Sequence, residues 1–260
     1  MTVAAPIRRT RVSDAFLATN RRRRILDGLA KAIAETSYWD AHIADIVRLG
    51  GCARKTFYDA FGSKADAGRA LLSDVCPVID RSPEDGAAVT LALEIVALWR
   101  AGKEDAALEE ARAAQALLSS LAGRELSLPE VDESLQGTLP PGRHGLPREF
   151  VRANQRHRLL CGLASAVAEH GFRSTTIAHV TSNAAVSRRT FYEHFTSADD
   201  AALGLLVSDD AINPASALGA VAVEAVAAKL TGKDRSSADE AEVLLRILVA
   251  RFEDGEQVPA

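Results

Sequence analysis

The chain is poor in aromatic residues and in cysteine, and it has no long uninterrupted apolar run. Only 5% of its 260 residues are aromatic, and its three cysteines, Cys52, Cys76 and Cys161, stand singly. Scattered cysteines argue against a disulfide framework or a zinc site, so we interpret them as small apolar residues. No stretch reaches the roughly 18 apolar residues of a membrane span, and no apolar signal core follows the N-terminal arginines. We therefore expect a cytoplasmic protein without a membrane segment.

Sequence patterns of catalysis and of metal binding are absent as well. The six histidines show no HExxH-like spacing. We find no nucleophile elbow, phosphate loop or catalytic triad pattern. The acidic pairs at 199–200 and 209–210 consist of adjacent residues, which point apart on a helix. We therefore expect neither an enzyme nor a bound cofactor or metal.

Alanine-rich apolar stretches, in contrast, are abundant. Hydrophobic residues make up 47% of the chain and include runs such as AAVTLALEIVALW and ASALGAVAVEAVAAKL. Alanine has the highest helix propensity, so the sequence predicts an all-α fold. Residues 123–147 differ from the rest, since they hold four of the nine prolines and show little periodicity. This segment is typical of a linker.

The chain contains an internal repeat. With an offset of 134 residues, residues 20–67 align with residues 154–201 without a gap, and 20 of the 48 positions are identical. The strongest match pairs RKTFYDAFGS at 54–63 with RRTFYEHFTS at 188–197. Such extended identity indicates two tandem copies of one structural unit.

Apolar spacing predicts three helices in each unit. Apolar residues recur every four positions along a first helix, which should end near residues 36 and 170. A second helix is expected at 43–49 and 177–183, and a third at 53–60 and 187–194, with Gly-Gly or Ala-Ala between them. Two short helices around a small-residue turn form a helix-turn-helix. Ser187 is a good N-cap for the third helix, whereas Ala53 is not.

Helical patterns continue after each unit. We expect helices at 64–76, 84–101 and 104–122 after the first unit, and at 198–209, 214–231 and 237–253 after the second. Helices 84–122 should pair with helices 214–253 in a four-helix arrangement, so that one chain imitates a dimer. The short tails leave little room for the cavity of a small-molecule effector.

Charge follows the same division of the chain. We divide it into a basic N-terminal arm (1–19), a first helix-turn-helix unit (20–64), a first helical tail (65–122), a linker (123–147), a second helix-turn-helix unit (148–198) and a second helical tail (199–260). Basic residues outnumber acidic ones by 12 to 6 in residues 1–64 and by 7 to 3 in residues 148–198. Acidic residues dominate elsewhere, by 14 to 7 and by 12 to 5. The two basic blocks are suited to phosphate backbones.

The third helix of each unit has the residue types that a DNA-reading helix needs. Cationic and hydroxyl side chains lie at its N-terminal end, where base edges are reached, and two phenylalanines four apart should dock it on the first helix. A tyrosine can contact a phosphate or a thymine methyl group. The candidate DNA contacts are Arg54, Lys55, Thr56 and Tyr58 in the first unit, and Ser187, Arg188, Arg189, Thr190, Tyr192 and His194 in the second.

The second unit, TTIAHVTSNAAVSRRTFYEHFTSADD, resembles the N-terminal helix-turn-helix of the TetR family of bacterial regulators. The first, HIADIVRLGGCARKTFYDAFGSKAD, is similar to a diverged copy of it. The resemblance covers about 48 residues twice and implies a dimeric transcriptional regulator, usually a repressor, on double-stranded DNA. It also implies phosphate contacts from the starts of the second and fourth helices, which correspond here to Thr175, Thr176 and Lys64.

Each copy departs from the family pattern at a different place. Ala198 replaces the usual lysine in the second unit, whereas Ala41 and His42 replace the threonines in the first. One hypothesis is a regulator with two non-identical reading helices and an asymmetric operator. The alternative is a degenerate protein-interaction module that pairs with another regulator and binds DNA weakly or through one unit. The sequence leaves open whether the chain acts as a pseudo-dimer or forms a homodimer with four helix-turn-helix units.

Overall fold

A computed structural model describes residues 13–128, 145–206, 212–233 and 237–254. Within these ranges every regular element is an α-helix, which confirms the all-α prediction for this part of the chain. Residues 1–12 of the expected basic arm and residues 129–144 of the expected linker lie outside the described residues.

Two groups of four helices correspond to the two halves of the repeat. They are α1 (Asp14–Glu35), α2 (Ile43–Leu49), α3 (Arg54–Ala60) and α4 (Lys64–Ser73), and then α7 (Arg148–His170), α8 (Ile177–Asn183), α9 (Arg188–His194) and α10 (Ala198–Leu206). The helices α2 and α8 occupy the residues expected from the sequence. Each long first helix packs against the three that follow it, so both groups have the same internal arrangement.

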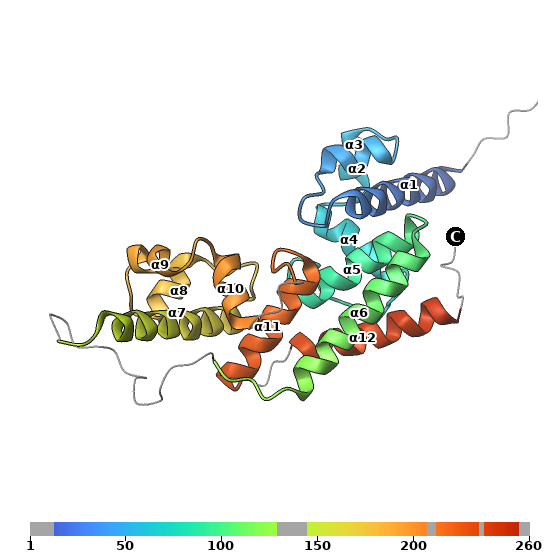
Figure 1. Ribbon diagram of the computed structural model, residues 1–260. Coiled ribbons are helices and arrows are strands. Elements are labelled where there is room, and N and C mark those ends of the chain that lie inside the picture. Colours follow the sequence, from blue (N-terminus) through green and yellow to red (C-terminus); the bar gives the residue numbers. More distant parts are fainter. Residues whose placement is uncertain (1–12, 129–144, 207–211, 234–236, 255–260) are drawn as a thin grey trace, which may run out of the picture.

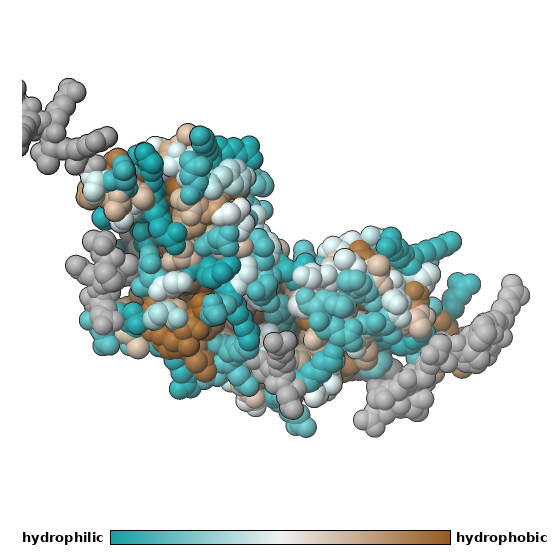
Figure 2. Space-filling view, turned by 180° about the vertical axis from the view of Figure 1, so that it is seen from behind, coloured by the Kyte–Doolittle hydropathy of each residue, from teal (hydrophilic) through white to brown (hydrophobic). Residues whose placement is uncertain are grey.

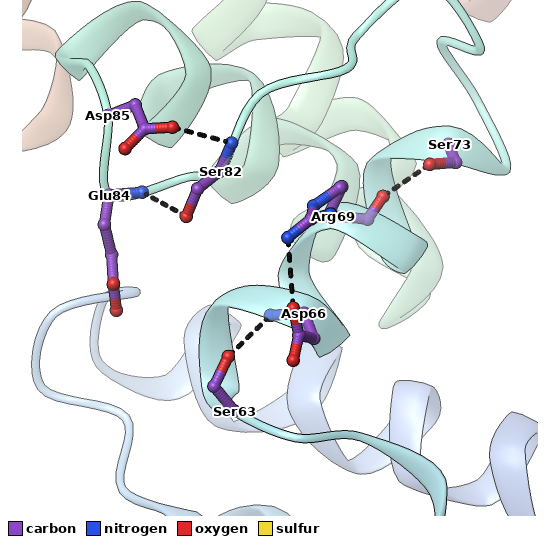
Figure 3. Close-up of polar contacts among 7 residues, drawn as sticks. All are labelled: Ser63, Asp66, Arg69, Ser73, Ser82, Glu84 and Asp85. Atoms are coloured by element: carbon purple, nitrogen blue, oxygen red, sulfur yellow. Dashed lines mark hydrogen bonds and ion pairs between the residues drawn. The ribbon is translucent and has the colours of Figure 1, made fainter.

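Side-chain caps fix the start of α4 and the segment that follows it (Figure 3). The hydroxyl of Ser63 accepts a hydrogen bond of 3.1 Å from the amide of Asp66, whose carboxylate pairs with Arg69 at 3.0 Å. In the connection after α4, the amide of Ser82 donates to the carboxylate of Asp85 at 3.1 Å. An N-cap of this kind contributes about 1 kcal/mol. The short α4 therefore has a defined first turn where it follows α3.

Four tail helices from the two halves pack against one another. They are α5 (Ala87–Arg100), α6 (Glu104–Gly123), α11 (Ala217–Thr231) and α12 (Ser237–Glu253). Both α5 and α6 contact both α11 and α12. The helices α5 and α11 are buried on nearly all sides, as expected for helices that are apolar around their whole circumference. They form the centre of the molecule.

The two repeat units lie at different ends of these tail helices (Figure 1). In this view α1 to α4 lie at the upper right and α7 to α10 lie at the left. The first helix α1 packs on α5, and its counterpart α7 packs on α11. Each unit is thus mounted on the central helix of its own tail.

The outer surface is mostly hydrophilic over the repeat units, and it has a hydrophobic patch on the side of α6 and α12 (Figure 2). Val243 on α12 is 57% exposed, and the rings of Trp99 and Phe252 lie 5.5 Å apart. No helix in the described ranges is both long enough and apolar enough to cross a membrane.

Candidate nucleic-acid interface

The turn between the second and third helices has the same backbone form in both units. Gly51 has a φ of 58° and Ala185 a φ of 51°. This left-handed conformation suits glycine and costs about 1–2 kcal/mol for a residue with a Cβ. The chain therefore keeps the turn geometry in the second unit although the residue there is alanine.

A glycine in each first helix lets the second helix come close. A Cβ on Gly28 would lie 2.3 Å from the carbonyl oxygen of Ile46, and one on Gly162 would lie 2.7 Å from that of Val180. Both positions face backbone atoms, which cannot move aside without shifting a helix. The close approach explains why the repeat has glycine at both positions.

An arginine of the first helix fixes the turn in each unit. Arg24 donates to the carbonyl oxygens of Gly50, at 3.1 Å, and Gly51. Arg158 donates to those of Ala184 and Ala185, at 2.6 and 2.8 Å. Charge-assisted bonds of this kind satisfy the carbonyl groups that end the second helix. These two arginines therefore stabilise the helix-turn-helix of their own units.

Two phenylalanines anchor each third helix, as the sequence predicted. Phe57 and Phe191 are fully buried, and Phe61 and Phe195 are 5% and 4% exposed. An arginine of the first helix lies over the second ring of each pair, with Arg22 at 4.4 Å from the centroid of Phe61. The equivalent pair in the second unit, Arg156 and Phe195, is 4.9 Å apart. Cation–π contact adds to the apolar docking of the third helix.

The opposite face of each third helix points to solvent. Its exposed candidate DNA contacts are Arg54, Lys55 and Tyr58 on α3, and Arg188, Arg189 and Tyr192 on α9. Tyr58 is 47% exposed and Tyr192 is 59% exposed, values far above those of the buried phenylalanines beside them. Arg189 pairs with Glu193 one turn later at 3.1 Å. Each short helix thus has one anchored face and one cationic, aromatic face that is free to contact a ligand.

Three further candidate contacts of the second unit form hydrogen bonds at or near the ends of its helices. Thr176 caps α8 by accepting from the amide of His179 at 3.3 Å, and Ser187 caps α9 by accepting from the amide of Thr190 at 3.0 Å. Thr175 donates from its hydroxyl to the carbonyl oxygen of Gly171 at 2.8 Å. The expected cap of α9 is therefore present, while α3, which follows Ala53, has no side-chain cap. Phosphate contacts from these residues stay predictions.

Lys64 is engaged inside the first unit. Its ammonium group donates to the carbonyl oxygens of Tyr38, Trp39 and Ala41 at 2.8, 3.3 and 3.3 Å. Burial lowers its pKa, against the opposing attraction of Glu84 and Asp40. An ammonium group has three donors, so these three acceptors use all of them. The contact of Lys64 with a phosphate stays a prediction, and it requires the lysine to give up at least one of these bonds.

His194, at the end of α9, lies beside the first helix of its unit. Its Nε2 is 3.4 Å from the side-chain oxygen of Gln155. Burial, followed by the charges of Arg152 and Arg156, lowers the pKa of His194, so the imidazole is neutral at pH 7. A neutral ring can donate or accept a hydrogen bond at the end of α9.

Sequence reasoning missed two glutamates that accept hydrogen bonds from backbone amides of the repeat units. Glu94 and Glu224 accept hydrogen bonds from the amides of Tyr38 and Phe172, at 3.0 and 2.8 Å. Burial raises the pKa of both carboxyl groups. The two glutamates are 130 residues apart rather than 134, so a gap-free alignment does not pair them. The short matching stretches LALE and AVAVE were the signal that could have revealed them.

A small pocket lies where the ends of α6 and α11 meet the start of α12. Its volume is about 280 Å³, and Lys229 and Lys233 are among its lining residues. Lys229 donates to carbonyl oxygens at the end of α6, including that of Leu121 at 3.3 Å. The volume is just below the range of roughly 300–1,000 Å³ typical of small-molecule sites. Among the described residues no group of three or more histidine, cysteine or acidic side chains could hold a metal ion.

Residues 163–200 match the family model described as bacterial regulatory proteins, tetR family. The second unit is therefore similar to the DNA-binding domain of that family. The matched residues include the end of α7, the whole helix-turn-helix and the start of α10. TetR-family regulators are generally non-enzymatic DNA-binding proteins, and the match therefore points to a DNA-binding transcriptional regulator. The first unit lies outside the matched residues, and its relation to the family stays a prediction from the repeat. Comparisons with curated proteins and with solved structures give no match.

Proposed function

We propose that the protein is a sequence-specific transcriptional repressor that reads two related DNA half-sites with α3 and α9. One observation carries this proposal: both helices bury two phenylalanines and expose a pair of basic residues and a tyrosine at equivalent positions. An isolated basic patch is commonly a solvated surface. A cationic face on a helix anchored in a helix-turn-helix, repeated at the same spacing, has the form needed in a major groove.

We further propose that one chain acts as an intramolecular pseudo-dimer. Equivalent helices of the two tails contact each other, α5 with α11 and α6 with α12, and the cross pairs also touch. This pattern resembles the self-complementary contact of two subunits related by a two-fold axis. The two reading helices would then meet successive major grooves, about 10 base pairs apart.

The operator should be asymmetric, because the two reading helices differ at both of their ends. Ala53 and Ser187 differ at the helix start, and Ala60 and His194 differ at its end. Hydrogen-bonding groups on α9 that α3 lacks give its half-site additional base or phosphate contacts. The second unit should therefore contribute more of the sequence preference.

Selection of bound duplexes from a random library tests this function. A single bipartite motif with unlike half-sites about 10 base pairs apart supports it. A perfect palindrome would show that like units pair between chains. Absence of any enriched motif, together with binding that does not weaken as salt increases, would exclude DNA reading and favour the interaction module.

Charge reversal on each reading helix separates the two units. Arg54→Glu and Arg188→Glu should each weaken binding to the selected duplex, because each replaces a groove-facing cation by an anion. Arg246→Glu, on the surface of α12, makes the same charge change away from both reading helices and should leave binding unchanged. An effect of Arg188→Glu alone would mean that only the second unit binds DNA.

A further inference from the structure

The two repeat units contact each other at a pair of equivalent positions. The guanidinium carbon of Arg173 lies 5.1 Å from the centroid of the Trp39 ring. Trp39 belongs to the connection between α1 and α2, and Arg173 belongs to that between α7 and α8. The two residues are 134 positions apart, which is the offset of the repeat. The contact therefore joins the equivalent positions of the two units.

The residue types at this contact are complementary. An arginine guanidinium stacks on an indole face, and partial burial strengthens the attraction. If two chains paired like unit with like unit, Trp39 would face Trp39 and Arg173 would face Arg173. Two guanidinium groups in contact repel each other, so the like-with-like arrangement is disfavoured. The difference between the two copies at this position selects pairing of a first unit with a second unit.

Arg173 also interacts with residues of both helical tails. The guanidinium group donates to the carbonyl oxygen of Ala215, just before α11. Four carboxylates attract its charge, and the first among them is Glu94 on α5 of the other half; the others are Asp199, Asp40 and Glu224. The indole nitrogen of Trp39 and the Nε of Arg173 are buried without a hydrogen-bond partner in the described structure. The pair is therefore partly buried between the halves.

A hydrogen bond to a glutamate of the tail also holds each connection at the residue before the contact. The amide of Tyr38, the residue before Trp39, donates to Glu94, and the amide of Phe172, the residue before Arg173, donates to Glu224. The helices α2 and α8 begin four residues after Trp39 and Arg173 respectively. Any shift of the two connections relative to each other therefore moves one helix-turn-helix relative to the other.

We propose that the Arg173–Trp39 contact is the joint that sets the separation of α3 and α9, and hence the spacing between the half-sites that the protein accepts. The effect on half-site spacing rests on the proposed DNA-reading function. The contact between the two connections, in contrast, is present in the protein without DNA. Arg173 and Trp39 are positioning residues, because neither lies on the exposed face of a reading helix.

A spacing series of duplexes tests the consequence. The selected half-sites are kept and the base pairs between them are varied one at a time. The wild type should lose on the order of 100-fold in affinity away from its best spacing, because two-point binding is lost. Arg173→Ala should lose less than about tenfold over the same series, with an unchanged half-site preference. An equally sharp optimum in Arg173→Ala would overturn the proposal.

A distance measurement without DNA tests the joint itself. Spin labels are placed at Arg48→Cys on α2 and Ser182→Cys on α8, equivalent exposed positions, with the partly buried Cys52 and Cys161 replaced by alanine. The wild-type background should give one narrow distance distribution, and Arg173→Ala should broaden or shift it. Identical narrow distributions would refute the joint. If the wild type binds no duplex, the proposed function fails while this measurement still decides on the joint.

Two further variants separate the joint from general loss of structure. Arg173→Lys keeps the positive charge and loses the planar stack, so it should broaden the distance distribution even where Arg173→Ala proves unstable. Arg81→Ala removes a different contact between the halves, the exposed 2.9 Å ion pair with Glu240. This control should leave the distribution narrow. If Arg81→Ala broadens it as much as Arg173→Lys does, the contact at Trp39 has no special role.

Discussion

Arg158 donates a hydrogen bond of 2.8 Å to the carbonyl oxygen of Ala185, the residue that has a φ of 51° in the turn of the second unit. The bond holds the turn in a conformation that alanine disfavours. Ala185→Gly should therefore stabilise the protein by about 1 kcal/mol, because relief of the backbone strain outweighs the added freedom of the unfolded chain. Urea unfolding followed by circular dichroism measures the change.

The first unit provides the reverse control for this prediction. Gly51 has the equivalent φ of 58°, so Gly51→Ala should cost about the same free energy of unfolding that Ala185→Gly gains. Both variants leave the reading helices unchanged in sequence. A destabilising effect of Ala185→Gly would mean that the methyl group of Ala185 contributes packing that outweighs the strain.

The close approach of α7 and α8 gives a second prediction. Gly162→Ala would place a Cβ 2.7 Å from the carbonyl oxygen of Val180 and 2.8 Å from the amide nitrogen of Ala184. Because both are backbone atoms, the helices must separate, and the free energy of unfolding should fall by about 2 kcal/mol. Gly123→Ala, at the end of α6, is the matched control, since its Cβ would meet open space. Thermal unfolding of both variants checks the contrast, and an equal effect would contradict it.

These local features show how far the sequence alone could predict the structure. The bounds of α2 and α8 followed from the gap-free repeat and the small residues of the turn, because short-range steric preferences determine both. The burial of Phe57 and Phe191 followed from their spacing to the next phenylalanine, four residues later at the end of the helix. Local patterns of this kind need no knowledge of the other half of the chain.

The long-range contacts could not be predicted in the same way. Trp39 lies in the connection between α1 and α2, and its stacking partner Arg173 lies 134 residues away in a different connection. Glu94 and Glu224 are equivalent residues, but they are 130 positions apart, four fewer than the offset of the repeat. Pairing across the halves depends on how the tail helices cross, which apolar periodicity within one helix does not specify.

The buried Glu224 gives a third prediction, on pH dependence. Burial raises the pKa of this carboxyl group above its ordinary value of 4.5, against the opposing bonds from Phe172 and Ser237. The folded state therefore holds the proton to higher pH than the unfolded state, and stability is lost as the pH rises from about 4.5 through the raised pKa. Glu224→Gln has no such loss, so its stability relative to the wild type should increase with pH over this window.

Urea unfolding at several pH values checks this dependence. Glu109→Gln, on the exposed face of α6, removes a carboxylate that is not buried and should follow the wild-type pH profile. If the difference between Glu224→Gln and the wild type stays constant from pH 4.5 to 8, the carboxyl group of Glu224 does not titrate differently on folding.

The ion pair on α9 gives the last prediction. Arg189 is held by Glu193 at 3.1 Å, although both side chains are largely exposed. Glu193→Gln should tighten binding to the selected duplex about two- to fivefold, because it frees Arg189 and removes an anion that repels phosphates. Asp59→Asn makes the same charge change on α3, where Asp59 has no ion pair within the described part of the chain, and should have a smaller effect. A loss of affinity in Glu193→Gln would instead show that the carboxylate itself accepts a hydrogen bond from a cytosine in the groove.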